Sequence, residues 1–349
     1  MKLTFRWYGE NDPVTLDKIK QIPKMSGIVS AVYDVPVGEV WSMESINALK
    51  KSAEAHGLAF EVVESVPVHE EIKYGSENAD RLIENYCENV RRLASVGVRC
   101  ICYNFMPVFD WLRSELEHQN ADGSNSLAYS EEEVLKMDPM TSSLSLPGWD
   151  ESYTRDELSR LITIYKEIGE DGLWRNLEKF LKKVVPVAES VGINMAIHPD
   201  DPPWGIFGLP RIITSERNID RFLSIVPSSA NGLTFCTGSL GASTDNDLVK
   251  MARKYAQRVH FLHLRNISVA PERKFCETAH PTECGSLDMF GIVRSLVEGG
   301  FDGYVRPDHG RMIWGETGKY GYGLFDRALG ATYIVGLFEG IERTLKNDK

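Results

Sequence analysis

Eight short β-rich runs recur along the whole chain, and amphipathic stretches separate most of them. Strands that alternate with helices in this number predict a parallel sheet closed into a (β/α)8 TIM barrel. Several of the amphipathic stretches end in glycine just before the next strand, as at Gly57, Gly97 and Gly192. Glycine readily takes the left-handed conformation that closes a helix. The predicted strands are residues 4–8, 27–35, 59–66, 99–106, 193–199, 232–238, 259–266 and 303–308, and the clearest predicted helices are residues 42–56, 78–95, 173–191, 246–258 and 287–298.

Two segments interrupt this alternation. Residues from about 109 to 170 follow the fourth predicted strand and are polar and partly helical, and residues from about 268 to 286 follow the seventh. Both leave from the C-terminal end of a strand, so we expect both to cover the C-terminal mouth of the barrel. Loops this long inside a compact domain usually act as lids or binding loops. We therefore expect residues 1–349 to form a single barrel domain with two lid-like insertions.

Composition narrows the class of protein. The formal net charge is −11 and no lysine- or arginine-rich run is present, which argues against nucleic-acid binding. The chain has neither an N-terminal apolar stretch of signal-peptide length nor an apolar run of the roughly 18 residues that a membrane span needs. The cysteines are few and several lie in apolar runs, which favours reduced thiols in a cytoplasmic protein. They are Cys87, Cys100, Cys102, Cys236, Cys276 and Cys284.

Four consecutive predicted strands, the fifth to the eighth, end at a good metal ligand. These ligands are His198, Cys236, His263 and Asp308. In a (β/α)8 barrel the C-terminal ends of the strands converge on one mouth, where such enzymes keep their chemistry. The pattern therefore predicts one metal ion at the mouth. Imidazole and thiolate suit zinc, whereas chelation of a hydroxy acid needs open coordination positions and favours manganese or ferrous iron.

A second metal site is conceivable in the later insertion. Cys276, His280 and Cys284 form a C-x3-H-x3-C pattern that resembles part of a structural zinc site. The pattern supplies only three ligands, and Pro281 would disrupt any helix that aligned them. We therefore regard this site as the weaker alternative.

Two residues are candidates for acid–base chemistry. His309 directly follows Asp308 and opens a loop, so it can project toward a substrate beside the metal; it could equally anchor that loop. Tyr322 lies between Gly321 and Gly323, which allow the backbone to bend and present the phenol at the mouth. An ordinary surface turn would use such glycines as well.

Other strand-end residues are candidates for substrate binding. Arg265 shares strand parity with His263, so we expect both side chains to point into the mouth. Aromatic and amide groups at a barrel mouth commonly bind sugar hydroxyls, although each could also serve packing. The substrate-binding candidates are Trp7, Tyr8, Asn104, Arg265 and Asn266.

The longer motifs around these residues resemble those of the mannonate dehydratase family, a group of acid-sugar lyases within the xylose-isomerase-like TIM barrels. The resemblance extends in order over essentially the whole chain. The matching runs are residues 5–14, 38–41, 102–111, 198–203, 232–239, 263–266, 306–310 and 321–324.

The resemblance implies a cytosolic enzyme that dehydrates D-mannonate to 2-keto-3-deoxy-D-gluconate in hexuronate (glucuronate) breakdown. It implies one divalent metal ion, Mn²⁺ or Fe²⁺, held by the four strand-end ligands named above. It also implies that His309 and Tyr322 are the catalytic pair. We expect the small-molecule substrate D-mannonate, no nucleic-acid or membrane partner, and a homodimer.

The chemistry of this reaction suits the candidate residues. A divalent ion that chelates the carboxylate and the 2-hydroxyl takes up the charge of the developing enediolate. A base then removes the proton from carbon 2, and an acid helps the 3-hydroxyl leave. We favour Tyr322 near the carbon-2 proton, with His309 as relay or acid, and Arg265 to hold the carboxylate or tune the site.

Three other functions deserve comparison. A metal-dependent sugar isomerase or epimerase on the same barrel is the main alternative, but such enzymes rely on more carboxylate ligands, often for two ions. A DNA-repair nuclease on a barrel is disfavoured by the acidic charge. A non-catalytic sugar-binding protein would leave the metal ligands and His309 without a purpose.

Overall fold

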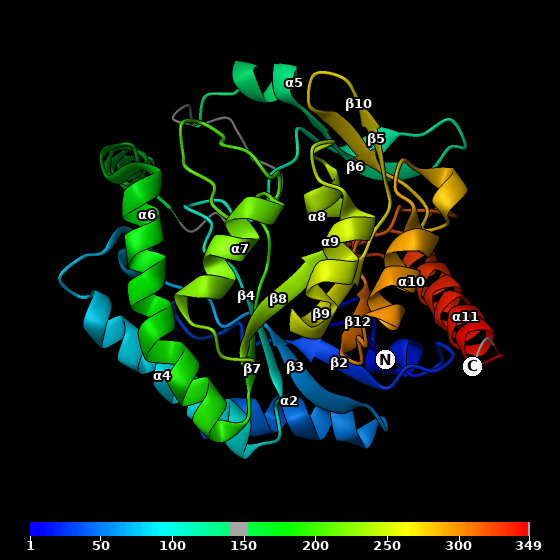
Figure 1. The fold of residues 1–349 in the computed structure, drawn as a ribbon, viewed down its shortest axis with the longest axis horizontal. Coiled ribbons are helices and arrows are strands. Elements are labelled where there is room, and N and C mark those ends of the chain that lie inside the picture. The colour runs from blue at the N-terminus through cyan, green and yellow to red at the C-terminus, as the bar shows by residue number, and fades with distance from the viewer. Residues whose placement is uncertain (140–152, 348–349) are drawn as a thin grey trace.

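The structure, a computed structural model, describes residues 1–139 and 153–347. Its parallel strands close into a barrel in the order β1-β12-β9-β8-β7-β4-β3-β2 (Figure 1). All eight predicted strands are present, which confirms the TIM-barrel fold. Most end two or more residues earlier than predicted. The strands are β1 Lys2–Arg6, β2 Gly27–Ser30, β3 Ala59–Glu64, β4 Cys100–Tyr103, β7 Asn194–Ile197, β8 Asn231–Cys236, β9 Val259–Leu264 and β12 Tyr304–Pro307.

The predicted helices are also present and surround the barrel. The predicted helix at residues 173–191 is the second part of a long helix that begins at Arg155, and its first part lies in the segment expected to be partly helical. Thr154 and Glu157 start this helix with a reciprocal capping box, and Gly169 interrupts it with a non-helical conformation. The longer helices are α2 Met43–Ala55, α4 Ala79–Ser95, α6 Arg155–Val191, α7 Glu216–Ile225, α9 Leu248–Tyr255, α10 Met289–Glu298 and α11 Phe325–Asn347, and the shorter ones are α1 Leu16–Ile19, α3 Glu70–Tyr74, α5 Glu131–Lys136 and α8 Thr237–Gly241.

The described parts of the two insertions, of which residues 140–152 lie outside the described range, contribute strands to one sheet that the sequence did not indicate. Its strands are β5 Glu115–Gln119, β6 Asn125–Ser130, β10 Ile267–Ala270 and β11 Lys274–Glu277, in the antiparallel order β10-β11-β6-β5. In Figure 1 this sheet lies near the top of the view, close to α5. β11 of the later insertion pairs with β6 of the earlier one, and the rings of Tyr129 and Phe275 stack across that pair at 5.4 Å. These strands are short, and their pairing links distant parts of the chain.

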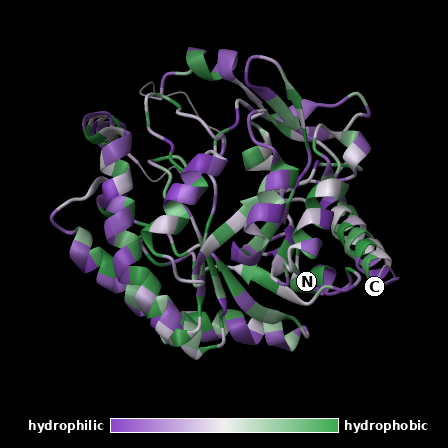
Figure 2. Cartoon of the chain, viewed as in Figure 1, coloured by the Kyte–Doolittle hydropathy of each residue, from purple (hydrophilic) through white to green (hydrophobic). Residues whose placement is uncertain are grey.

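Apolar side chains occupy both faces of the barrel sheet. One cluster contains Val29, Val62, Cys100 and Phe261 from the barrel strands, and a much larger cluster contains neighbours of opposite parity together with helix residues. The central strands are mostly hydrophobic, whereas the surrounding helices carry both kinds of residue (Figure 2). All six cysteines are free thiols. Among the described residues, we find no helix with the length and hydropathy that crossing a bilayer requires.

Candidate active site

The four predicted metal-ligating side chains come from the ends of four neighbouring strands, β7, β8, β9 and β12. The ligand atoms of His198, Cys236 and His263 all lie within 4.8 Å of one another. The Asp308 carboxylate approaches the same group, with Oδ2 3.4 Å from Cys236 Sγ and Oδ1 3.5 Å from His263 Nδ1. Cys236 and His263 are direct partners in the β8–β9 register, which explains why they meet. The structure therefore brings all four side chains together.

The protonation of these groups suits a cation. Nδ1 of His198 lies 2.7 Å from the Pro199 carbonyl oxygen, so that nitrogen donates a hydrogen bond and Nε2 keeps a free lone pair. Burial, and then the neighbouring Arg306, hold the pKa of His263 well below its usual value, so the ring is neutral. Burial and the Asp308 carboxylate raise the pKa of the Cys236 thiol to about 12. A thiolate beside a carboxylate needs a cation, and this donor set fits a divalent metal.

Arg306 contacts two of the four candidate metal ligands, Asp308 and His263. Its Nη2 lies 2.8 Å from Asp308 Oδ1 and 3.0 Å from Glu64 Oε1, and its Nε lies 3.0 Å from His263 Nε2. Burial alone would raise the pKa of Asp308, but the Arg306 charge holds it well below its usual value. Asp308 is therefore ionised and oriented. Glu64, Cys102 and His263 also approach within 4.8 Å of one another, and the Arg306 guanidinium lies against this second group.

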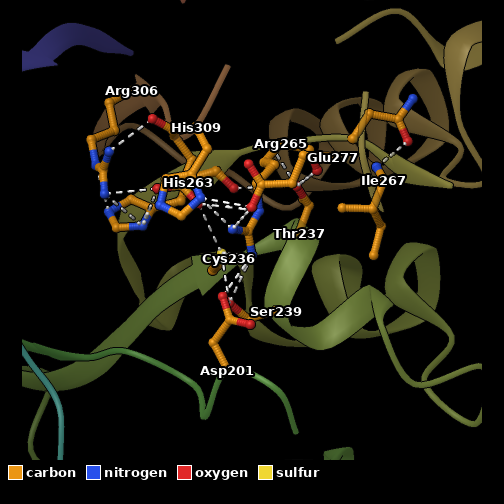
Figure 3. A network of polar contacts seen from close by, with 12 residues as sticks. Asp201, Cys236, Thr237, Ser239, His263, Arg265, Ile267, Glu277, Arg306 and His309 are labelled. Atoms are coloured by element: carbon orange, nitrogen blue, oxygen red, sulfur yellow. Dashed lines mark hydrogen bonds and ion pairs between the residues drawn. The ribbon is translucent and has the colours of Figure 1, made fainter. Parts of the chain in front are cut away.

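A buried ionic network lies behind the cluster (Figure 3). Arg265 contacts Asp201 Oδ2 through Nη2 and Glu277 Oε1 through Nη1, each at 2.8 Å. Arg113 binds both oxygens of Asp201, at 2.8 and 3.0 Å, and reaches Glu277 at 3.0 Å. Gly238 lets Arg265 approach, since a Cβ at this glycine would lie only 2.0 Å from Arg265 Nε. The network ties the loops after β4, β7 and β9 to the insertion sheet.

The candidate catalytic pair is in direct contact. Nε2 of His309 lies 2.8 Å from the Tyr322 hydroxyl, and Nδ1 lies 2.8 Å from Glu277 Oε1. Burial, and then the neighbouring Tyr8, raise the pKa of Tyr322 well above its usual value, so the phenol carries its proton. Gly321 has a φ of 78°, and an added Cβ would meet Leu127 at 2.7 Å. Only glycine suits this bend, which brings Tyr322 to His309.

These groups line one end of a cavity of about 1200 Å³. Its wall includes Asp308, His309 and Tyr322 together with two predicted substrate-binding residues, Tyr8 and Asn104.

Three predicted substrate-binding residues lie elsewhere. Trp7 is only 2 % exposed in the apolar core, because residues alternate along β1 and its neighbours Arg6 and Tyr8 face the cavity instead. The Asn266 amide donates to the Pro281 carbonyl and accepts from the backbone N–H of Ile267 and Leu287, so it anchors a loop. Arg265 is fully buried behind the cavity and paired with carboxylates, which leaves it no reach toward a substrate.

The alternative zinc site is not supported. Cys276, His280 and Cys284 are all described, yet they do not form a group with metal-ligand spacing. His280 is buried against Gly330 of α11, whereas Cys284 is exposed.

Sequence reasoning missed several charged residues of the site. Arg6 and Glu64 are the last residues of β1 and β3, so the strand-end argument could have included both. Asp201 follows the His198 motif within three residues and offered a similar signal. Arg113 and Glu277 belong to the insertions, where no local pattern marks them.

A family model and two relatives of known description match nearly the whole chain, and all three are described as mannonate dehydratase. The family model described as D-mannonate dehydratase (UxuA) matches residues 1–348. The mannonate dehydratase of Streptococcus uberis is 53% identical over 348 residues, which is 99% of this chain and 100% of that protein. The one from Oceanobacillus iheyensis is 55% identical over 342 residues and 98% of each chain.

Solved structures agree with these relatives. The crystal structure of mannonate dehydratase from Streptococcus suis serotype2 superposes with a TM-score of 0.93 and 48% identity, over 99% of this chain and 96% of that one. D-psicose 3-epimerase from Clostridium cellulolyticum H10 has a TM-score of 0.59 at 13% identity, over 98% of this chain and 99% of that one, and shares the fold alone.

Proposed function

Because the chain belongs to the mannonate dehydratase family and is thus a hydro-lyase, we propose that its strand-end side chains hold one divalent cation beside His309 and Tyr322. The reaction removes water from D-mannonate and forms 2-keto-3-deoxy-D-gluconate, a step of hexuronate catabolism. The observation that carries the proposal is that both candidate catalytic residues line one cavity with the candidate ligands His198 and Asp308.

We propose His198, Cys236, His263 and Asp308 as the ligands of this cation, and Mn²⁺ or Fe²⁺ as its identity. When bound, it supplies Lewis-acid stabilisation for the negative charge that develops next to the substrate carboxylate. Manganese and ferrous iron accept five or six ligands, so four protein donors would leave one or two positions for substrate oxygens.

The charge of the site supports an anionic substrate. Four arginines pair with four carboxylates around the proposed ligands, so their formal charges cancel. A divalent cation together with the Cys236 thiolate adds one net positive charge, which matches the single negative charge of a hexonate. The eight side chains are Arg6, Arg113, Arg265, Arg306, Glu64, Asp201, Glu277 and Asp308.

We propose the following proton path. Tyr322 takes the proton from carbon 2 as its own hydroxyl proton passes to Nε2 of His309, 2.8 Å away. The C–H electron pair becomes the carbon 2–carbon 3 double bond, and the bond from carbon 3 to its hydroxyl breaks. His309 gives its proton to the departing hydroxyl, which leaves as water. The enol then moves its 2-hydroxyl proton to carbon 3 and becomes the ketone. Tyr8 and Asn104, which line the same cavity, orient the sugar hydroxyls.

The surroundings of the site support further proposals. Trp111 and Glu277 from the two insertions approach His309, so we propose that the insertion sheet covers the mouth and belongs to the same domain as the barrel. We also propose that the enzyme is cytoplasmic.

We also propose a homodimer. Trp314 is 75% exposed, its ring lies 5.7 Å from that of Phe325, and Leu329 follows one turn later on α11. Burial of these apolar side chains against a second copy would stabilise the pair.

The test of the activity is a substrate panel. Metal-reconstituted protein is incubated with D-mannonate, D-gluconate and other aldonates, and products are followed by mass and by the 2-keto-3-deoxy group. We expect loss of one water from D-mannonate. An isomer of unchanged mass would favour the sugar isomerase instead, and no turnover of any aldonate would contradict the lyase.

The test of the metal site is Cys236→Ser. A hydroxyl stays protonated where a thiol ionises on a metal, so we expect lower metal occupancy after dialysis. The exposed Cys284 provides a matched control, because Cys284→Ser changes the same atom away from the site. Equal occupancy in both variants would overturn the assignment of Cys236.

A further inference from the structure

Three buried side chains, Glu277, His309 and Tyr322, form a continuous row of polar contacts. The Glu277 carboxylate contacts Nδ1 of His309 at 2.8 Å, and Nε2 of the same ring contacts the Tyr322 hydroxyl at 2.8 Å. Glu277 lies at the end of β11 in the later insertion and is only 1% exposed. A carboxylate on the far side of a catalytic imidazole is a common means of orienting such a ring.

Glu277 is ionised, so it can only accept hydrogen bonds. Burial alone would raise the pKa of Glu277, but the hydrogen bond from His309 and the guanidinium charges of Arg265 and Arg113 hold it below its usual value. Three donors converge on its Oε1. Arg265 Nη1 and His309 Nδ1 lie at 2.8 Å (Figure 3), and Arg113 Nη2 lies at 3.0 Å. Its Oε2 has no hydrogen-bond partner among the described residues. The position of Oε1 is therefore set by two buried guanidinium groups.

This arrangement selects one form of the imidazole ring. Nδ1 of His309 also lies 2.8 Å from Arg265 Nη1, which is always a donor. Since Oε1 accepts from both nitrogens, Nδ1 carries a hydrogen and Nε2 keeps its lone pair. The protonated Tyr322 hydroxyl then donates to Nε2. Without the carboxylate, Arg265 would donate to Nδ1 and the hydrogen would move to Nε2.

We infer that Glu277 is a positioning residue, which holds His309 in the tautomer whose Nε2 accepts the Tyr322 proton. This inference rests on the proposed roles of His309 and Tyr322. Trp111 of the earlier insertion contributes as well, because its ring lies 5.7 Å from that of His309. Both insertions thus place side chains against the catalytic histidine, and the later one determines which of its nitrogens is basic.

A direct test reads the tautomer in the intact protein. Histidine labelled with ¹⁵N is incorporated, the protein is loaded with diamagnetic Zn²⁺, and the His309 signals are identified by their loss in His309→Asn. We expect the Nδ1–H tautomer in the wild-type protein. An Nε2–H tautomer there would overturn the inference. Because this readout needs no turnover, it remains decisive even if the proposed dehydration fails.

Two variants connect the tautomer to catalysis. Glu277→Gln keeps the shape and one acceptor oxygen but removes the charge, and we expect kcat to fall by about 10- to 100-fold with metal content and KM unchanged. Glu277→Leu removes the acceptor, and we expect the Nε2–H tautomer and a larger loss of kcat. If Glu277→Leu does not fold, Glu277→Gln alone decides through kcat.

The matched control is Glu272→Gln, because Glu272 is 80% exposed at the β10–β11 turn of the same hairpin. We expect its kcat to equal that of the wild type. A Glu277→Gln enzyme with full kcat would contradict the inference, and so would one that loses only metal or stability while kcat per bound metal stays unchanged.

Discussion

The close approach of Arg265 to the backbone of α8 makes Gly238→Ala an informative change. An added Cβ would lie 2.0 Å from Arg265 Nε and 2.7 Å from its Cζ and Nη2, which is far inside van der Waals contact. The guanidinium cannot stay there. It must move away from Asp201 and Glu277, which it now contacts at 2.8 Å each.

The expected loss of stability in Gly238→Ala follows from the burial of the ion pairs that Arg265 forms. Breaking a buried ion pair costs about 3–5 kcal/mol, and alanine in place of glycine in a helix returns about 1 kcal/mol, so we expect a net destabilisation of about 2–4 kcal/mol. With 349 residues and an unfolding entropy of about 2.1 cal/mol/K per residue, 1 kcal/mol shifts Tm by about 1.4 °C. Gly238→Ala should therefore lower Tm by roughly 3–6 °C.

The matched control is Gly336→Ala in α11. Apart from its chain neighbours and the backbone of its own helix, no atom of the described chain comes within 4 Å of where its Cβ would stand. The same chemical change should here raise stability by about 0.5–1 kcal/mol, or roughly 1 °C in Tm. Differential scanning calorimetry on both variants measures whether Tm falls in Gly238→Ala and rises in Gly336→Ala.

Activity provides the second readout. Displacement of Arg265 removes a donor that fixes Glu277, which in turn contacts His309, so kcat of Gly238→Ala should fall by about 100-fold. Gly336→Ala should keep full kcat. If Gly238→Ala unfolds at the wild-type temperature and retains its activity, the close packing of Arg265 does not have the importance that we assign to it.

Three more predictions concern the site and its surroundings. His309→Asn should abolish turnover while metal analysis finds the cation still bound; substantial activity would remove His309 from the mechanism. Removal of metal by a chelator should abolish dehydration, and added Mn²⁺ or Fe²⁺ should restore it; full activity without metal would contradict the proposal. Burial lowers the pKa of His260 to about 4; since the unfolded residue takes up a proton below about pH 6.5, stability should fall as pH drops from 6.5 to 4, and denaturation of His260→Gln should show a smaller slope.

The sequence by itself was sufficient to predict the barrel and to group four strand-end side chains as candidate metal ligands. β-rich runs that alternate with helical patterns are a local property, and in a parallel barrel all strands end at the same mouth. Residues at the ends of β7, β8, β9 and β12 must therefore converge, whatever the details of packing. His198, Cys236, His263 and Asp308 can be grouped for this reason from the sequence alone.

The same reasoning failed where a side chain depends on partners that are distant in the chain. Arg265 lies next to a barrel strand as expected, yet its side chain is held by ion pairs with Asp201 and Glu277 that form only in the folded protein, and Trp7 packs in the apolar core. The pairing of β6 with β11 joins two polar insertions, and the β10–β11 hairpin, in which Glu277 pairs with Ile267, brings Glu277 to His309. Such contacts depend on which surfaces meet in the folded protein. An insertion has no periodic sequence pattern from which its partner segment could be predicted. The tertiary structure therefore decided how the candidate catalytic histidine is held.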